Sequence, residues 1–189
     1  MATVRAWTRQ VTQVLDEIEL TGRYAVKEEY VRAKNGSISD YYLKHYRWLT
    51  QRCRSIIDID PQLDLPIWLA LTEDQRLGCA RGNVSLTLDV PENKLVIIDY
   101  ERWGYQLNDM YVPSSPQDEN LFNQELKRYG ISNEASLITG NQGNFYPLLK
   151  QKVIKSWDRV FTPSPVMSEN VGCIWEILPE WIVEIERYD

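Results

Sequence analysis

Apolar residues recur with helical spacing in two long stretches of the chain. Residues 40–57 carry apolar side chains at intervals of four, three, four and three, namely Tyr42, Tyr46, Leu49, Cys53 and Ile56. A second stripe covers residues 149–161, and Pro163 and Pro165 follow it. This spacing places the apolar side chains on one face of a helix, so we expect two amphipathic helices that pack on a sheet. Ser37 or Ser39 is available to cap the first helix.

The opening of the chain predicts a strand that leads into a helix. Residues 3–8 mix β-branched and aromatic side chains, which favours a strand. Apolar residues then follow a helical face as far as Ile18, and Gly22 provides a helix stop. Residues 24–35 have weak periodicity, and we expect them to be irregular. A modest helix is predicted over residues 117–129.

Short apolar or alternating runs predict the remaining strands. They lie at residues 67–71, 84–89 and 95–98, and in the closing stretch 171–188, where Pro179 and Glu180 separate two runs. We read the closing stretch as a pair of strands in one mixed sheet. The pattern predicts a single α+β domain over residues 1–189, with a mixed or antiparallel sheet of about six strands flanked by three or four helices. The polar stretch at about 113–144 is expected to be an insertion, a lid or a partner-facing segment.

Length and charge narrow the class of protein. The chain has 189 residues, which suits one domain, and its formal net charge is -6. An acidic chain has little general affinity for nucleic-acid backbones, so nucleic acid is an unlikely partner, although Arg47, Arg52 and Arg54 leave that interpretation open. The sequence has no run long enough to span a membrane and no signal-peptide core. We therefore expect a cytoplasmic protein without a membrane partner.

Few residues suit metal or nucleophilic chemistry. The chain has three cysteines without short spacing, Cys53, Cys79 and Cys173, and one histidine, His45. This set predicts neither a disulfide framework nor a metal site. No phosphate-binding glycine loop, nucleophile elbow or calcium loop can be written from the sequence. Seven Trp and eleven Tyr suit either a core or a pocket that stacks planar ligands. Trp103, Tyr105 and Asn108 follow a buried strand, where ligand crevices often lie.

Motifs spread along the chain resemble domain of unknown function family 3841, an uncharacterised bacterial family. They are Val4–Gln10, Gly22-Arg-Tyr24, Pro66-Ile-Trp68, Asp99 with Trp103 and Leu107-Asn108, Arg128–Ile131, Ser156-Trp157, Trp175-Glu-Ile177 and Glu180-Trp-Ile182. The resemblance covers nearly the whole chain, and membership implies no activity.

A more distant resemblance carries a chemical expectation. The opening strand, the helix ending in Gly-Arg-Tyr and the closing Glu176-Ile-Leu are similar to the frame of the ADP-ribosyltransferase-like superfamily. That resemblance implies NAD as substrate, a macromolecular acceptor and a transfer or NAD-cleaving reaction. It implies catalytic roles for Glu176 and Arg9, since a carboxylate beside a sugar carbon stabilises an oxocarbenium-like transition state. The NAD-binding residues implied are Arg5, Thr8, Tyr24, Trp103, Tyr105 and Asn108.

Two departures from this pattern favour an alternative. The first strand has no histidine, and Ile174 stands where a second polar residue would precede Glu176. Together with the polar stretch at 113–144, they favour a non-enzymatic binding or interaction module.

Overall fold

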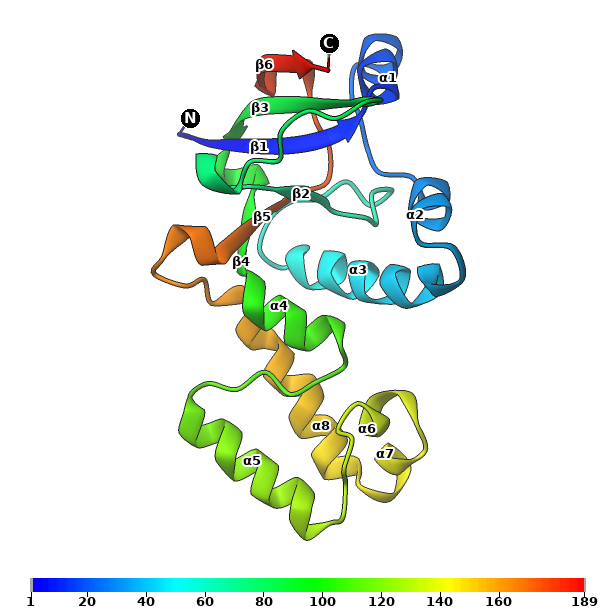
Figure 1. The fold of residues 1–189 in the computed structure, drawn as a ribbon, viewed down its shortest axis with the longest axis vertical. Coiled ribbons are helices and arrows are strands. Elements are labelled where there is room, and N and C mark those ends of the chain that lie inside the picture. The colour runs from blue at the N-terminus through cyan, green and yellow to red at the C-terminus, as the bar shows by residue number, and fades with distance from the viewer. Residues whose placement is uncertain (1, 189) are drawn as a thin grey trace. The chain divides into compact units, whose positions relative to one another are not determined.

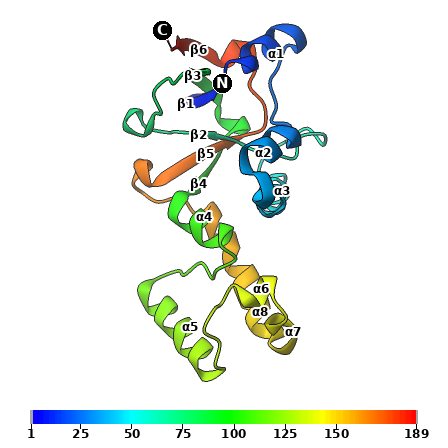
Figure 2. The ribbon, with the colours of Figure 1, turned by 45° about the vertical axis from the view of Figure 1, so that its right-hand side comes forward.

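The computed structural model describes residues 2–188, which form two compact units. The first unit comprises the described residues up to Ile97 together with those from Pro165 onward, and the second is Ile98–Ser164. All six strands begin in the first unit. The fourth strand, β4, crosses into the second unit, whose other elements are helices (Figures 1 and 2). The α+β class and the number of strands predicted from the sequence are confirmed.

One sheet of the first unit is built on the opening strand. It has the order β1-β3-β6, from β1 (Thr3–Val11), β3 (Asn83–Pro91) and β6 (Ile182–Arg187), and both pairings are antiparallel. Residues directly opposite on neighbouring strands share a face. Arg5 therefore faces the same side as its partner Asp89, and Thr8 faces the opposite side together with Leu86.

The second sheet contains the other closing strand. Its order is β2-β5-β4, from β2 (Ile67–Leu69), β5 (Asn170–Ile174) and β4 (Val96–Asp99). The two sheets meet at Trp7 and Ala70, whose backbones exchange hydrogen bonds of 3.0 and 2.8 Å. The closing strands thus lie in different sheets rather than side by side, because a 3-10 turn at Pro179–Trp181 redirects the chain between them.

Local chemistry explains where the first helix ends and why the second forms. Helix α1 (Gln13–Thr21) stops at Gly22, which has φ 78° and whose N–H donates to the carbonyl of Ile18. Helix α2 (Glu28–Asn35) was not expected, since Val31 is its one buried residue. Val31 packs with Leu65 and with Leu43 of helix α3 (Ser39–Cys53), and exposed ion pairs of Glu28 with Arg32 and Arg47 contribute little more. The prediction of an irregular segment at 24–35 is therefore wrong for most of its length.

Helix α3 (Ser39–Cys53) carries the strongest predicted stripe. It ends four residues before the expected limit, where residues 54–56 turn away. The predicted serine cap is absent: Ser39 is buried and its hydroxyl donates to the carbonyl of Gly36. A buried contact fixes the helix to the second sheet, because the indole N–H of Trp175 donates to the Thr50 hydroxyl at 2.8 Å.

The core of the first unit lies between the sheets and α1. It is aliphatic, with two aromatic side chains, and comprises Ala6, Val14, Ile18, Tyr24, Ile67, Leu69, Leu71, Val84, Leu86, Leu88, Val90, Leu95, Ile174, Ile177 and Trp181. Burial of such a set supplies the main driving force for folding the unit.

The second unit is an arrangement of helices that includes the polar stretch 113–144. Its helices are α4 (Tyr100–Leu107), α5 (Pro116–Arg128), α6 (Ser136–Thr139), α7 (Gln142–Phe145) and α8 (Pro147–Ser156), which a 3-10 turn at Trp157–Phe161 extends. Asp99 caps α4 by accepting the N–H of Arg102, as predicted, and Ser115 caps α5. Within residues 2–188, no helix is both long and apolar enough to cross a membrane.

Candidate functional site

Two groups of polar side chains are candidates for function, one in each unit. The first surrounds Glu176. Tyr24 and Ile177 exchange backbone hydrogen bonds of 2.9 Å, which brings Arg23 beside Glu176. Arg23 Nη1 lies 3.4 Å from Glu176 Oε2 and 3.0 Å from Asp60 Oδ2.

Charge limits what the Glu176 group can bind. One guanidinium stands between two carboxylates, so the group has a formal charge of -1. The pKa of Asp60 is lowered by the backbone N–H of Gln62 and by Arg23, so this carboxylate is ionised at neutral pH. Because Arg23 is already neutralised, the group has little attraction for a pyrophosphate. Glu176 was predicted from the sequence as a site residue, whereas Arg23 was not, although Arg23 lies in the Gly22-Arg-Tyr24 motif.

The expected NAD-binding residues of the first strand point in different directions. Arg5 lies opposite Asp89 and pairs with it, Nε to Oδ1 at 2.6 Å. Arg9 is exposed and donates to the carbonyl of Gly78 at 3.3 Å. Both arginines lie on one face of β1, whereas Thr8 is buried on the other face. The strand therefore cannot direct all three side chains at one ligand.

The remaining predicted residues have clear structural roles. Tyr24 is buried, and its burial raises its pKa to about 12. Trp103, Tyr105 and Asn108 belong to α4 and its end in the second unit. Trp103 is buried, burial raises the pKa of Tyr105, and the Asn108 amide donates to the Gly104 carbonyl of its own helix at 2.7 Å.

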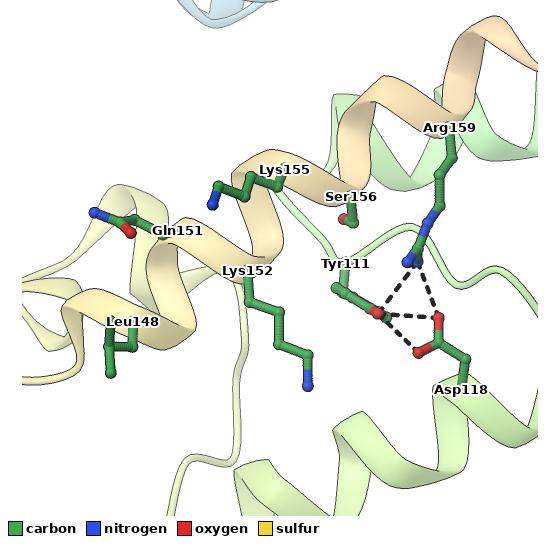
Figure 3. A pocket seen from close by; sticks show the side chains of 8 residues that line it. All are labelled: Tyr111, Asp118, Leu148, Gln151, Lys152, Lys155, Ser156 and Arg159. Atoms are coloured by element: carbon green, nitrogen blue, oxygen red, sulfur yellow. Dashed lines mark hydrogen bonds and ion pairs between the residues drawn. The ribbon is translucent and has the colours of Figure 1, made fainter.

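The second candidate is a pocket between α5 and α8, which we call the α5–α8 pocket (Figure 3). It has a volume of about 490 Å³ and is lined by Tyr111, Asp118, Leu148, Gln151, Lys152, Lys155, Ser156 and Arg159. Figure 3 shows Tyr111 and Arg159 converging on Asp118, and Lys152 reaching from α8 toward α5. The lining residues thus come from both helices, from the chain that precedes α5 and, for Arg159, from the 3-10 turn that follows α8.

A hydrogen-bond network fixes one end of the pocket. The Tyr111 hydroxyl lies 2.9 Å from both carboxylate oxygens of Asp118, and Arg159 Nη1 lies 2.9 Å from Oδ2. The backbone N–H of Ser114, the hydroxyls of Ser114 and Tyr111 and the charge of Arg159 hold the pKa of Asp118 at about 2. Arg159 Nη1 also donates to the Val112 carbonyl at 2.6 Å. This end is therefore rigid and fully ionised at neutral pH.

Cationic groups remain available in the pocket. Lys155 is exposed and has no ion-pair partner within the part of the chain that the structure describes. All the side-chain hydrogen bonds of Arg159 run through Nη1, which leaves its Nε and Nη2 available among the described residues. Lys152 pairs with Glu125 at 2.6 Å while 42% of its side chain stays exposed.

The charge of the pocket contrasts with that of the chain. Three cations and one carboxylate give the lining a formal charge of +2, which becomes +1 when Glu125, the partner of Lys152, is included, whereas the chain carries -6. A second pocket of about 430 Å³, on another side of α5, has Lys127 as its one ionic lining residue, and its other polar lining groups are amides and a hydroxyl. Of these two pockets, the α5–α8 pocket is the stronger candidate for an anion.

Sequence reasoning missed this pocket because it followed the apolar stripe of α8. Leu148, Lys152, Lys155 and Arg159 are spaced four, three and four apart, which is the spacing of one helical face. That second stripe is the signal in the sequence, but nothing in it shows that α5 lies opposite. Over residues 2–188, no group of three or more His, Cys, Asp or Glu side chains is placed to hold a metal ion.

Comparison with known proteins identifies a family and no activity. No curated protein and no solved structure matches the chain. A family model described as domain of unknown function (DUF3841) matches residues 5–183, which run from β1 into β6 and include both candidate sites. The chain therefore belongs to the DUF3841 family.

Proposed function

We propose that the chain is a non-enzymatic binding module that takes an anionic ligand in the α5–α8 pocket. The observation that carries the proposal is the Lys155 ammonium, which has no partner among the described residues and lies in a pocket whose lining has a formal charge of +2. In an acidic protein, such a local concentration of positive charge attracts anions that the rest of the surface repels.

The fixed end of the pocket supports the same function. Three contacts hold Arg159 Nη1, so Nε and Nη2 are oriented before any ligand arrives. An oriented guanidinium loses less conformational entropy on binding than a mobile one. Asp118 occupies one edge of Arg159 and leaves the other edge for a second anion.

Titration with inorganic phosphate and citrate, followed by the backbone amide resonances of the protein, tests this function. We expect saturable shifts in α5 and α8, and an affinity that falls as salt rises. Lys155→Gln should weaken binding by about threefold, the effect of one exposed charge. Lys150→Gln is the matched control, because Lys150 lies in α8 outside the pocket lining. Equal effects of the two variants, or no shifts with either anion, would contradict the proposal.

A second candidate function is NAD-linked ADP-ribosyl transfer or NAD cleavage at Glu176. The observation that favours it is the contact of Glu176 with Arg23, a carboxylate and a guanidinium that both reach solvent. In this hypothesis Glu176 stabilises the developing sugar cation, while Arg23, with Arg9 or Arg5, contacts phosphate or ribose. Of the residues expected to contact NAD, Tyr24 lies in the same unit as Glu176 and next to Arg23 in the chain, and a macromolecule would accept the ADP-ribosyl group.

The negative charge of the Glu176 group ranks this function second. The decisive assay is nicotinamide release from NAD by the wild type and by Glu176→Gln, each with and without a cell extract as a source of acceptor. Release that depends on Glu176 would support an enzyme. Absence of release under both conditions, or equal release by the two proteins, would remove this candidate.

A further inference from the structure

The α5–α8 pocket is open along its length, which restricts the shape of its ligand. Four of its lining residues on α8 are exposed to solvent: Leu148, Gln151, Lys152 and Lys155. Small-molecule sites usually enclose most of their ligand. An open, elongated surface instead suits a segment of polypeptide, which lies along the helix.

The surface also combines charge with exposed apolar area. Leu148 lines the pocket and is 79% exposed. Leu121 is 64% exposed and lies three residues after Asp118 on α5, which places both on one side of that helix. Inorganic phosphate or another small anion makes no use of these leucines. A ligand with both a carboxylate and an apolar side chain uses the cations and the leucines together.

We infer that the α5–α8 pocket binds an acidic peptide segment that carries one large apolar residue about three positions from its carboxylates. The spacing follows from α8. Leu148 and Lys155 are seven residues apart, which is about 10 Å along a helix that rises 1.5 Å per residue. An extended peptide covers about 10 Å in three residues. The apolar side chain packs on Leu148, and the carboxylates bind Lys155 and the open edge of Arg159.

This inference rests on the proposed anion-binding function and adds the class of partner. Its test compares two labelled peptides by fluorescence anisotropy: acetyl-Leu-Ser-Glu-Glu-Glu-amide and the same peptide with Ser in place of Leu. The leucine peptide should bind about fivefold tighter, as expected if about half of its apolar side chain leaves water. Lys155→Gln should weaken both peptides by about threefold.

Leu148→Ser separates the two contributions. In this variant the two peptides should bind with equal affinity, because the apolar contact is gone while the charges remain. The matched controls are Ile154→Ser and Lys150→Gln, which change α8 outside the pocket lining and should leave both affinities unchanged.

The outcomes distinguish the inference from the function on which it rests. If the peptides bind equally to the wild type and both depend on Lys155, the pocket binds anions and the peptide inference is wrong. If neither peptide nor inorganic phosphate binds, the proposed function fails as well. Binding to phosphatidylserine vesicles but not to peptide, or dimerisation that Lys155→Gln abolishes, would overturn the inference in favour of a membrane surface or a second copy.

Discussion

Asp118→Asn probes the network that fixes the α5–α8 pocket. Asp118 accepts hydrogen bonds from Ser114 and Tyr111 and pairs with Arg159, and its pKa is about 2. An unfolded aspartate has a pKa near 3.9, and each pKa unit corresponds to about 1.4 kcal/mol. The difference of about 1.9 pKa units corresponds to about 2.6 kcal/mol, and because the Asp118 side chain is 25% exposed, solvent screening reduces the expected stabilisation of the second unit to about 2 kcal/mol at neutral pH. Asparagine keeps the shape and one acceptor oxygen but loses the charge.

The effect of this substitution depends on pH with a definite sign. Because folding lowers the pKa of Asp118, its contribution is fully present above the unfolded pKa near 4, and it is lost as pH falls through about 2. Wild type and Asp118→Asn should therefore differ by about 2 kcal/mol in unfolding free energy at pH 7 and converge as pH approaches about 2.

Urea denaturation provides the assay. A chain of two units need not unfold in one step, so the amide resonances of α5 and α8 are followed, because they report on the second unit alone. Glu101→Gln is a control in the same unit, and it should change the free energy by less than about 1 kcal/mol. Equal stability of Asp118→Asn and wild type at pH 7, or a difference that stays constant down to pH 2, would refute the reasoning.

Three further predictions concern stability. Ser156→Ala should cost about 1–3 kcal/mol in urea denaturation, because it leaves the buried N–H of Val112 without its acceptor at 2.9 Å; an unchanged midpoint would contradict that role. Gly22→Ala should lower the free energy of unfolding by about 1 kcal/mol, because Gly22 has a φ of 78° that alanine adopts only with strain. Gly78 has no positive φ, and an added Cβ meets open space at both positions, so Gly78→Ala should be nearly neutral in the same denaturation assay. Subtracting the ultraviolet titration of Tyr24→Phe from that of the wild type should show Tyr24 ionising near pH 12. Because folding raises this pKa, the contribution of Tyr24 to stability should be lost as pH rises from about 10 to 12. Ionisation near pH 10 would show that Tyr24 is not buried.

Local signals in the sequence predicted most of the fold. Gly22 ended α1, Asp99 capped α4, and the apolar stripe defined α3, since each of these features acts within a few residues. Helix α2 escaped prediction because Val31 is its one buried residue, and the apolar partners of Val31, Leu43 and Leu65, lie in other segments of the chain. The two closing strands were assigned to one sheet because Pro179 and Glu180 show where the chain turns but not which strand the second run then pairs with.

The candidate sites were harder to predict than the elements. The position of Arg23 beside Glu176 depends on a backbone pairing across 153 residues, and no spacing in the sequence encodes it. The α5–α8 pocket likewise depends on which helices lie opposite each other. Sequence reasoning identified α8 by its buried stripe and passed over the cationic stripe beside it, since lysines on a helix usually face solvent without a ligand.

One measurement tests the central claim most directly: mapping amide shift changes while the acidic leucine peptide is titrated into the full chain. We predict that the changes concentrate at Leu148, Lys155 and Arg159, and that Lys155→Gln reduces them while Lys150→Gln does not. Changes centred on Arg23 and Glu176 would contradict the account, as would the absence of any saturable change in the second unit.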